Sequence, residues 1–242
     1  MLTCIKVSIS NNLNRGGIEI KSQSTSVTLN NITSIKILRK EYTGSVWSLI
    51  YTVEVSSKND LNFSLFDILT RSNTRYSYSF DVMSGSSRLE SQIFDDIECW
   101  FDGLFIGNFE HQYFAFANCE TETKRNTQVE YVTTLSGRTP YRVSNANTNY
   151  VTGKSSGLFF DLDANDNFTP DYFHKYSENV VDFLTDGSNK ILKTNDGQMW
   201  YVSVDDVIDL PFHDRYLGKN EISFSWTEIG YAPLFGMVID DE

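Results

Sequence analysis

The sequence predicts a mainly β protein, built as a β-sandwich followed by a second β-sandwich or barrel that carries one packed α-helix. Three observations predict it. Aromatic residues make up 14% of the 242 residues, whereas Pro is scarce at 4. Aromatic and β-branched side chains suit the half-buried surface of a sheet. Apolar and polar residues alternate in many short segments, and a single segment has the spacing of an amphipathic helix.

The first block, residues 1–98, is expected to form an antiparallel sandwich. In its clearest strand, at residues 46–55, five apolar side chains share one face, namely Trp47, Leu49, Tyr51, Val53 and Val55. Ile50 interrupts the opposite, polar face. Strict alternation follows at residues 76–82, and shorter runs occur at 27–29, 35–37 and 61–65. The order of a Trp strand and a Tyr-x-Tyr-x-Phe strand resembles an immunoglobulin or fibronectin type III module.

The second block, residues 99–242, is expected to contain further short strands with polar connectors. They are predicted at residues 101–106, 113–117, 127–132, 141–144, 156–160, 190–194, 199–204 and 222–226. Asn195, Asp196 and Gly197 lie between two apolar runs, which predicts a hairpin turn.

One helix is predicted at about residues 170–186. Thr169 is a suitable N-cap, Pro170 suits the first helical position, and Gly187 suits the position after the last turn. Apolar residues recur between them at intervals of three and four, which gives one buried stripe formed by Phe173, Tyr176, Val180, Phe183 and Leu184.

Charge and hydropathy exclude two classes of protein. The 20 Lys and Arg residues against 32 Asp and Glu residues give a formal net charge of −12, which opposes specific binding to DNA or RNA because phosphate is held by cations. No apolar run approaches the roughly 20 residues of a membrane span. Residues 1–17 lack the apolar stretch of a signal peptide, so we expect synthesis and assembly in a cytoplasm.

The residues that carry chemistry do not form a known catalytic or metal-binding pattern. Cys4, Cys99 and Cys119 are widely spaced and are expected to be reduced core residues. His111, His174 and His213 share no motif with a nucleophile or a ligand. Phosphate-binding glycine loops are missing from the sequence. We therefore expect no enzyme activity, no cofactor and no metal.

Two acidic segments have a functional and a simpler interpretation. Residues 161–167 resemble the start of a calcium loop, but Asp166 replaces the expected glycine and Tyr172 the expected acid, which favours a polar loop leading into the helix. Several acids lie close in sequence to Trp100, namely Asp95, Asp96, Glu98 and Asp102. They indicate either a sugar-stacking site that uses Trp100 and Tyr113, or a solvated connection between the two blocks.

Four stretches of the second block resemble tail structural proteins of tailed bacteriophages. They are FDGLFI at residues 101–106, RTPYRVSN at 138–145 with Asn149, Tyr150 and Gly153 after it, VDFLTDG at 181–187 with KILK and DGQMW after it, and ISFSWTEIG at 222–230. The similarity is greatest to minor tail, distal-tail and tail-tip or baseplate components of phages of Gram-positive bacteria. It covers most of residues 100–230.

This resemblance implies a virion protein that forms a ring or connector in the tail tube, distal tail or baseplate. Its expected partners are copies of itself and other tail proteins, around a channel through which DNA passes without specific binding. Carboxylates that line such a channel would repel phosphate, whereas a general role of the charge in solubility is the alternative.

The end of the sequence is apolar over residues 231–238. Tyr231, Leu234, Phe235 and Met237 are candidates for an arm that docks onto a neighbouring subunit, and a last strand packed on its own domain is the competing interpretation. Two other functions stay open. One is a carbohydrate-binding module for host recognition at the tail tip, and the other is a tail-attached glycosidase, which would need two carboxylates across a cleft.

Overall fold

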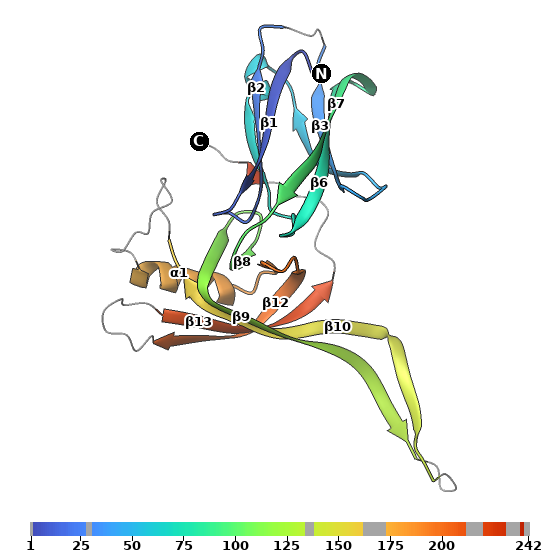
Figure 1. Ribbon diagram of the computed structural model, residues 1–242, viewed down its shortest axis with the longest axis vertical. Coiled ribbons are helices and arrows are strands. Elements are labelled where there is room, and N and C mark those ends of the chain that lie inside the picture. Colours follow the sequence, from blue (N-terminus) through green and yellow to red (C-terminus); the bar gives the residue numbers. More distant parts are fainter. Residues whose placement is uncertain are drawn as a thin grey trace. The chain divides into compact units, whose positions relative to one another are not determined.

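The computed structural model describes residues 2–27, 31–133, 138–161, 173–211, 220–230 and 238–239 (Figure 1). By their contacts, the residues form two compact units. The first contains Met1–Phe114, Lys193–Met199 and Ala232–Glu242, and the second contains Ala115–Leu192 and Trp200–Tyr231. The boundary expected after residue 98 stays a prediction.

The first unit contains two four-stranded antiparallel sheets. One sheet has the order β1 (Ile5–Asn12), β2 (Gly17–Ser24), β5 (Phe63–Asp67) and β14 (Val238–Ile239). The other has the order β4 (Ser48–Glu54), β3 (Ser34–Glu41), β6 (Thr74–Ser84) and β7 (Ser87–Cys99). A 3₁₀ turn, η1 (Lys58–Leu61), precedes β5. Both sheets contribute to one core, so the predicted sandwich is confirmed.

Strand β6 follows the predicted alternation. Tyr76, Tyr78, Phe80 and Val82 are all buried in the core. Their neighbours in β3, Ile35 and Ile37, are also fully buried.

The prediction for residues 46–55 is wrong in two respects. Val46 lies outside β4 and is 75% exposed, and the deeply buried side chain of the strand is Ile50. Leu38 pairs with Leu49 but Ile37 pairs with Tyr51, so Ile50 is an extra residue in a β-bulge. A bulge resets the alternation, which is why a residue expected on the polar face enters the core. Val27 lies outside any strand and is exposed, whereas Leu29 of the run expected at 27–29 lies outside the described residues.

The first two strands were not expected from the sequence. β1 and β2 pair over eight residues each, from Ile5 opposite Ser24 to Asn12 opposite Gly17. Ile18 and Ile20 of β2 are fully buried. The N-terminal residues thus belong to the sandwich.

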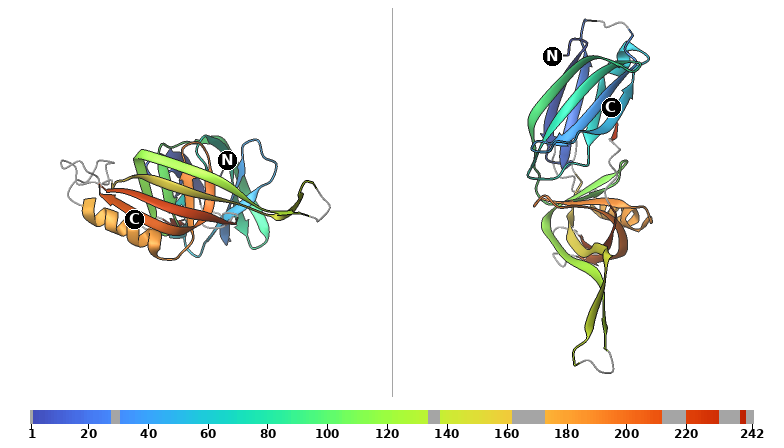
Figure 2. Two further views of the ribbon diagram at one scale, coloured as in Figure 1. Left: turned by 90° about the horizontal axis from the view of Figure 1, so that it is seen from below. Right: turned by 90° about the vertical axis from the view of Figure 1, so that its right-hand side faces the viewer.

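Six strands form a closed barrel in the order β10 (Tyr141–Phe159), β13 (Asn220–Gly230), β12 (Met199–Pro211), β11 (Lys190–Thr194), β8 (Leu104–Gly107) and β9 (Gln112–Val132) (Figures 1 and 2). In the second unit, Trp226 and Trp200 lie 5.0 Å apart between ring centroids. The Trp226 indole donates a hydrogen bond to the Ser155 hydroxyl at 3.0 Å, which satisfies its buried N–H. The Asn195–Gly197 turn between β11 and β12 is confirmed, with Gly197 at φ +88°.

The predicted helix is confirmed as α1 (Phe173–Thr185). Val180, Phe183 and Leu184 are buried, and Gly187 has a left-handed φ of +76°, as expected for the residue after the helix. The expected cap at Thr169 and Pro170 lies outside the described residues. Within the described part of the chain, no helix has the length and apolar character that a membrane crossing requires.

Candidate assembly surface

Strands β9 and β10 form a hairpin that continues beyond the barrel. β10 pairs with β9 from Tyr141 to Phe159, but it pairs with β13 only from Thr152 to Leu158. Among the described residues, the segment 141–151 therefore pairs with β9 alone. We call residues 124–133 and 138–151 the distal ribbon. It extends from the second unit as a two-stranded arm, drawn in green and yellow (Figures 1 and 2).

The residue types of this segment favour an extended pair of strands. Thr, Val and Tyr recur through residues 121–132, and these residues have high β-propensity. Tyr141 lies opposite Val132, and Val143 lies opposite Glu130. Because successive positions alternate between faces, Val132, Tyr141 and Val143 share one face, while Arg142 and its partner Tyr131 occupy the other.

The distal ribbon exposes an unusual amount of apolar surface. Tyr131 is 68% exposed, Tyr141 66%, Val143 54% and Val132 47%. A two-stranded hairpin is marginally stable by itself in water, and clustered exposed apolar groups mark interaction sites. The ribbon is therefore the candidate interaction surface of the second unit.

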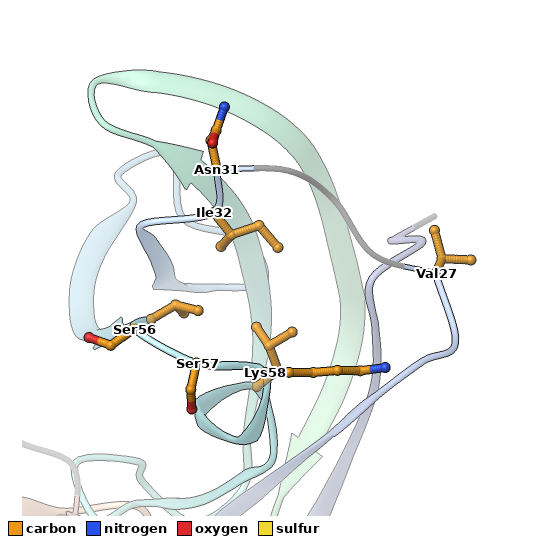
Figure 3. Close-up of a pocket in the computed structure, with 8 residues that line it drawn as sticks. Val27, Asn31, Ile32, Ser56, Ser57 and Lys58 are labelled. Carbon is orange, nitrogen blue, oxygen red and sulfur yellow. The ribbon is translucent and has the colours of Figure 1, made fainter.

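A small pocket lies in the first unit, where the segment before β3 meets η1 (Figure 3). Its volume is about 190 Å³. Val27, Ile32, Val55 and Leu61 give it apolar walls, and Asn31, Ser56, Ser57 and Lys58 give it a polar rim. Figure 3 shows the Lys58 side chain extended toward the segment that carries Val27. The arrangement suits a small ligand with a hydrogen-bond acceptor or an anionic group.

A buried polar cluster in the first unit is fully engaged in structural contacts. Arg39 Nη1 donates to both carboxylate oxygens of Asp67 at 2.7 Å, and the Tyr78 hydroxyl donates to the same carboxylate at 2.9 Å. Burial raises the pKa of Tyr78 well above its usual value. The ammonium of Lys193 donates to the carbonyl oxygens of Gly16 and Ile68, and burial lowers its pKa to about 8. These hydrogen bonds tie the buried polar groups into the core of the first unit.

The described residues contain no group of His, Cys, Asp or Glu side chains that could hold a metal ion. The three cysteines are free thiols, with Cys4 and Cys99 buried. His111 is described, whereas the side chains of His174 and His213 lie outside the described residues, as does the calcium-like segment after Asp161.

Trp100 lies in the connection between β7 and β8 and is 44% exposed. Its backbone N–H donates to the Asn11 side chain at 3.2 Å, and the Asn11 amide donates to its carbonyl oxygen at 2.7 Å. Tyr113 is half-buried near the start of β9. Sugar stacking by the two residues stays a prediction. Of the neighbouring acids, Asp96 pairs with Arg75 at 2.9 Å on the surface.

The four residues of the expected C-terminal arm, Tyr231, Leu234, Phe235 and Met237, lie outside the described residues, and their role stays a prediction. The segment after them pairs within the chain, because Val238 lies opposite Phe66 and Ile239 opposite Leu65. The distal ribbon was not predicted. The alternation of Thr with charged residues at 120–125 was the signal that could have indicated it.

No protein-family model and no curated protein matches the sequence. Two solved structures contain a similar chain. One is titled "Virion of native gene transfer agent (GTA) particle", with a TM-score of 0.34 and 12% identity over 56% of this chain and 94% of that chain. The other is titled "Tail of empty GTA particle computed with helical refinement, C6 symmetry", with a TM-score of 0.32 and 14% identity over 53% of this chain and 90% of that chain.

Proposed function

We propose that the protein is a non-enzymatic structural component of a bacteriophage tail, a ring or connector subunit of the tail tube, distal tail or baseplate that works by oligomerisation. The observation that carries the proposal is the distal ribbon, whose exposed Tyr131, Val132, Tyr141 and Val143 need a partner. The resemblance of residues 100–230 to tail proteins supports the same role.

The geometry of the ribbon favours repeated copies as the partner. A projecting arm fits a different surface on its neighbour, which makes a head-to-tail contact. Such contacts close into a ring when the rotation between copies closes, and otherwise continue as a filament. Both outcomes suit a tail, in which one subunit type repeats around or along a channel. The net charge of −12 favours passage of DNA through that channel without binding.

The test is the concentration dependence of assembly, measured by size-exclusion chromatography with light scattering and by electron microscopy. The ribbon variant Tyr141→Thr/Val143→Thr removes two exposed apolar side chains and keeps residues that favour strands. Its matched control is Tyr42→Thr/Val46→Thr, because Tyr42 and Val46 are 45% and 75% exposed and lie outside the ribbon. We expect the wild type and the control to form rings or filaments and the ribbon variant to stay monomeric.

A wild-type protein that stays monomeric at every concentration would contradict the proposal. So would a ribbon variant that assembles as well as the control. Both outcomes can be measured with the purified protein, because the proposed contact is between copies of one chain.

A second candidate function is recognition of a carbohydrate on the host surface. The pocket with its Lys58 and Asn31 rim favours it, as does the exposed Trp100. Binding of the monomer to isolated cell walls, weakened separately by Lys58→Met and by Trp100→Ala, would support this function. Cell-wall binding that both variants retain would exclude these two sites.

A further inference from the structure

The distal ribbon has a charge opposite to that of the remaining chain. Between residues 124 and 151 there are four cations, Lys124, Arg125, Arg138 and Arg142, and a single acid, Glu130. These give a formal net charge of +3. Because the total is −12, the rest of the chain carries −15.

The four cations are available to a partner. All four side chains are exposed, and none forms an ion pair with a residue that the structure describes. Pairing of the two strands brings together residues that are distant in sequence, since Arg125 lies opposite Val151 and Arg142 opposite Tyr131. By strand alternation, one face of the ribbon carries Val132, Tyr141 and Val143 together with Glu130, and the other face carries Tyr131 together with two arginines.

We propose that the distal ribbon is a basic docking arm whose partner is the acidic surface of a second copy of this chain. The proposal rests on the proposed function and names the surface that the assembly uses. The proposal is supported by charge complementarity, because the ribbon carries a formal net charge of +3 and the remaining residues of the chain carry −15. Like charges elsewhere on two copies repel each other, so the attraction also selects the ribbon as the point of contact.

Arginine suits this contact better than lysine does. Its planar guanidinium binds carboxylates through two parallel hydrogen bonds and stacks on aromatic rings. Three of the four cations are arginines, and Arg142 lies directly opposite Tyr131. On docking, the apolar side chains lose contact with water while the guanidinium groups pair with carboxylates of the neighbour.

The experiment compares two double charge reversals in the full chain. The ribbon variant is Arg125→Glu/Arg142→Glu. The control is Lys6→Glu/Arg71→Glu, which makes the same change in net charge at two exposed cations of the first unit. Circular dichroism checks that both variants are folded, and light scattering gives the concentration at which half of the protein is assembled.

We expect the ribbon variant to raise this concentration about tenfold or more at low salt, and the control to change it less than about threefold. Added NaCl should weaken assembly of the wild type and of the control, and should have little effect on the ribbon variant.

Equal effects of the two reversals would overturn the proposal. If Tyr141→Thr/Val143→Thr then still prevents assembly, the proposed function stands and the basic arm alone fails. If that apolar variant also assembles normally, both fail. Fluorescence anisotropy with a DNA duplex tests whether the basic ribbon binds nucleic acid instead of a second copy of the chain. DNA binding that is lost in Arg125→Glu/Arg142→Glu but kept in the control would also overturn the proposal.

Discussion

The Lys193 ammonium donates a hydrogen bond to the carbonyl oxygen of Ile68 at 2.8 Å, although the two residues are 125 positions apart in the sequence. The same group donates to the carbonyl oxygen of Gly16 and lies 5.2 Å from the centre of the Phe101 ring. One side chain thus joins three segments of the first unit. It is fully buried and has no carboxylate partner in this contact, so its charge is held by carbonyl dipoles and aromatic faces.

Lys193 should make stability depend on pH. Burial lowers its pKa from 10.5 to about 8, so between these values the unfolded chain binds more protons than the folded one. Stability therefore rises with pH across this window. We expect the free energy of unfolding of the wild type, relative to Lys193→Met, to increase by a few kcal/mol from about pH 8 to pH 10. Urea titrations of both proteins measure it, and a difference that stays constant with pH would contradict it.

Removing one partner of the buried Arg39 and Asp67 pair should destabilise the first unit far more than removing one partner of a surface pair. Asp67→Asn leaves the guanidinium buried without an opposing charge, which should cost about 3–5 kcal/mol. The exposed pair of Arg75 and Asp96 is the control, because Asp96→Asn should cost less than about 1 kcal/mol. Asn also tolerates the left-handed φ of +62° at position 96. Urea unfolding compares the two variants, and equal losses would contradict the prediction.

The sequence predicted the ends of the distal hairpin but not its middle. Strands were expected at 113–117 and 127–132, and again at 141–144 and 156–160, whereas the structure joins each pair into one strand, β9 or β10. Alternation of apolar and polar residues indicates a strand only where one face of that strand is buried. Residues 120–125 are polar and lie mostly in solvent, so they have no such face and resemble a loop.

Other differences have separate physical causes. Helix α1 was predictable because its apolar stripe and the glycine after its last turn indicate the same element. Ile50 was not, since a bulge depends on the pairing partner rather than on β4 itself. The basic ribbon was not predictable either, because Arg125 and Arg142 are 17 positions apart and only the hairpin register brings them onto one surface.

Gly153 should be required for the barrel. A Cβ at this position would overlap the Trp226 ring and lie 2.7 Å from the Glu122 carbonyl oxygen. Gly153→Ala should therefore cost about 1–3 kcal/mol through overpacking. Gly85→Asn is the control, since nothing lies within 4 Å of a Cβ there and Asn tolerates its φ of +57°. A thermal or urea transition that is unchanged in Gly153→Ala would show that the barrel can relax around the methyl group.

The distal ribbon should change its hydrogen exchange on assembly. In the monomer, residues 141–151 have one neighbouring strand, and the side chains of Tyr141, Arg142, Val143, Ser144, Asn149 and Tyr150 are exposed. The amides before Val151 should therefore exchange nearly as fast as those of an isolated hairpin. Residues 152–158 of the same strand pair with both β9 and β13 and should exchange slowly at all concentrations, which provides an internal control. Above the assembly concentration, we expect residues 141–151 to become protected in the wild type but not in Tyr141→Thr/Val143→Thr. Mass spectrometry of exchanged peptides measures both segments. Strong protection of residues 141–151 in the dilute monomer would mean that the ribbon is stable without a partner, and the physical basis for its role in assembly would be lost.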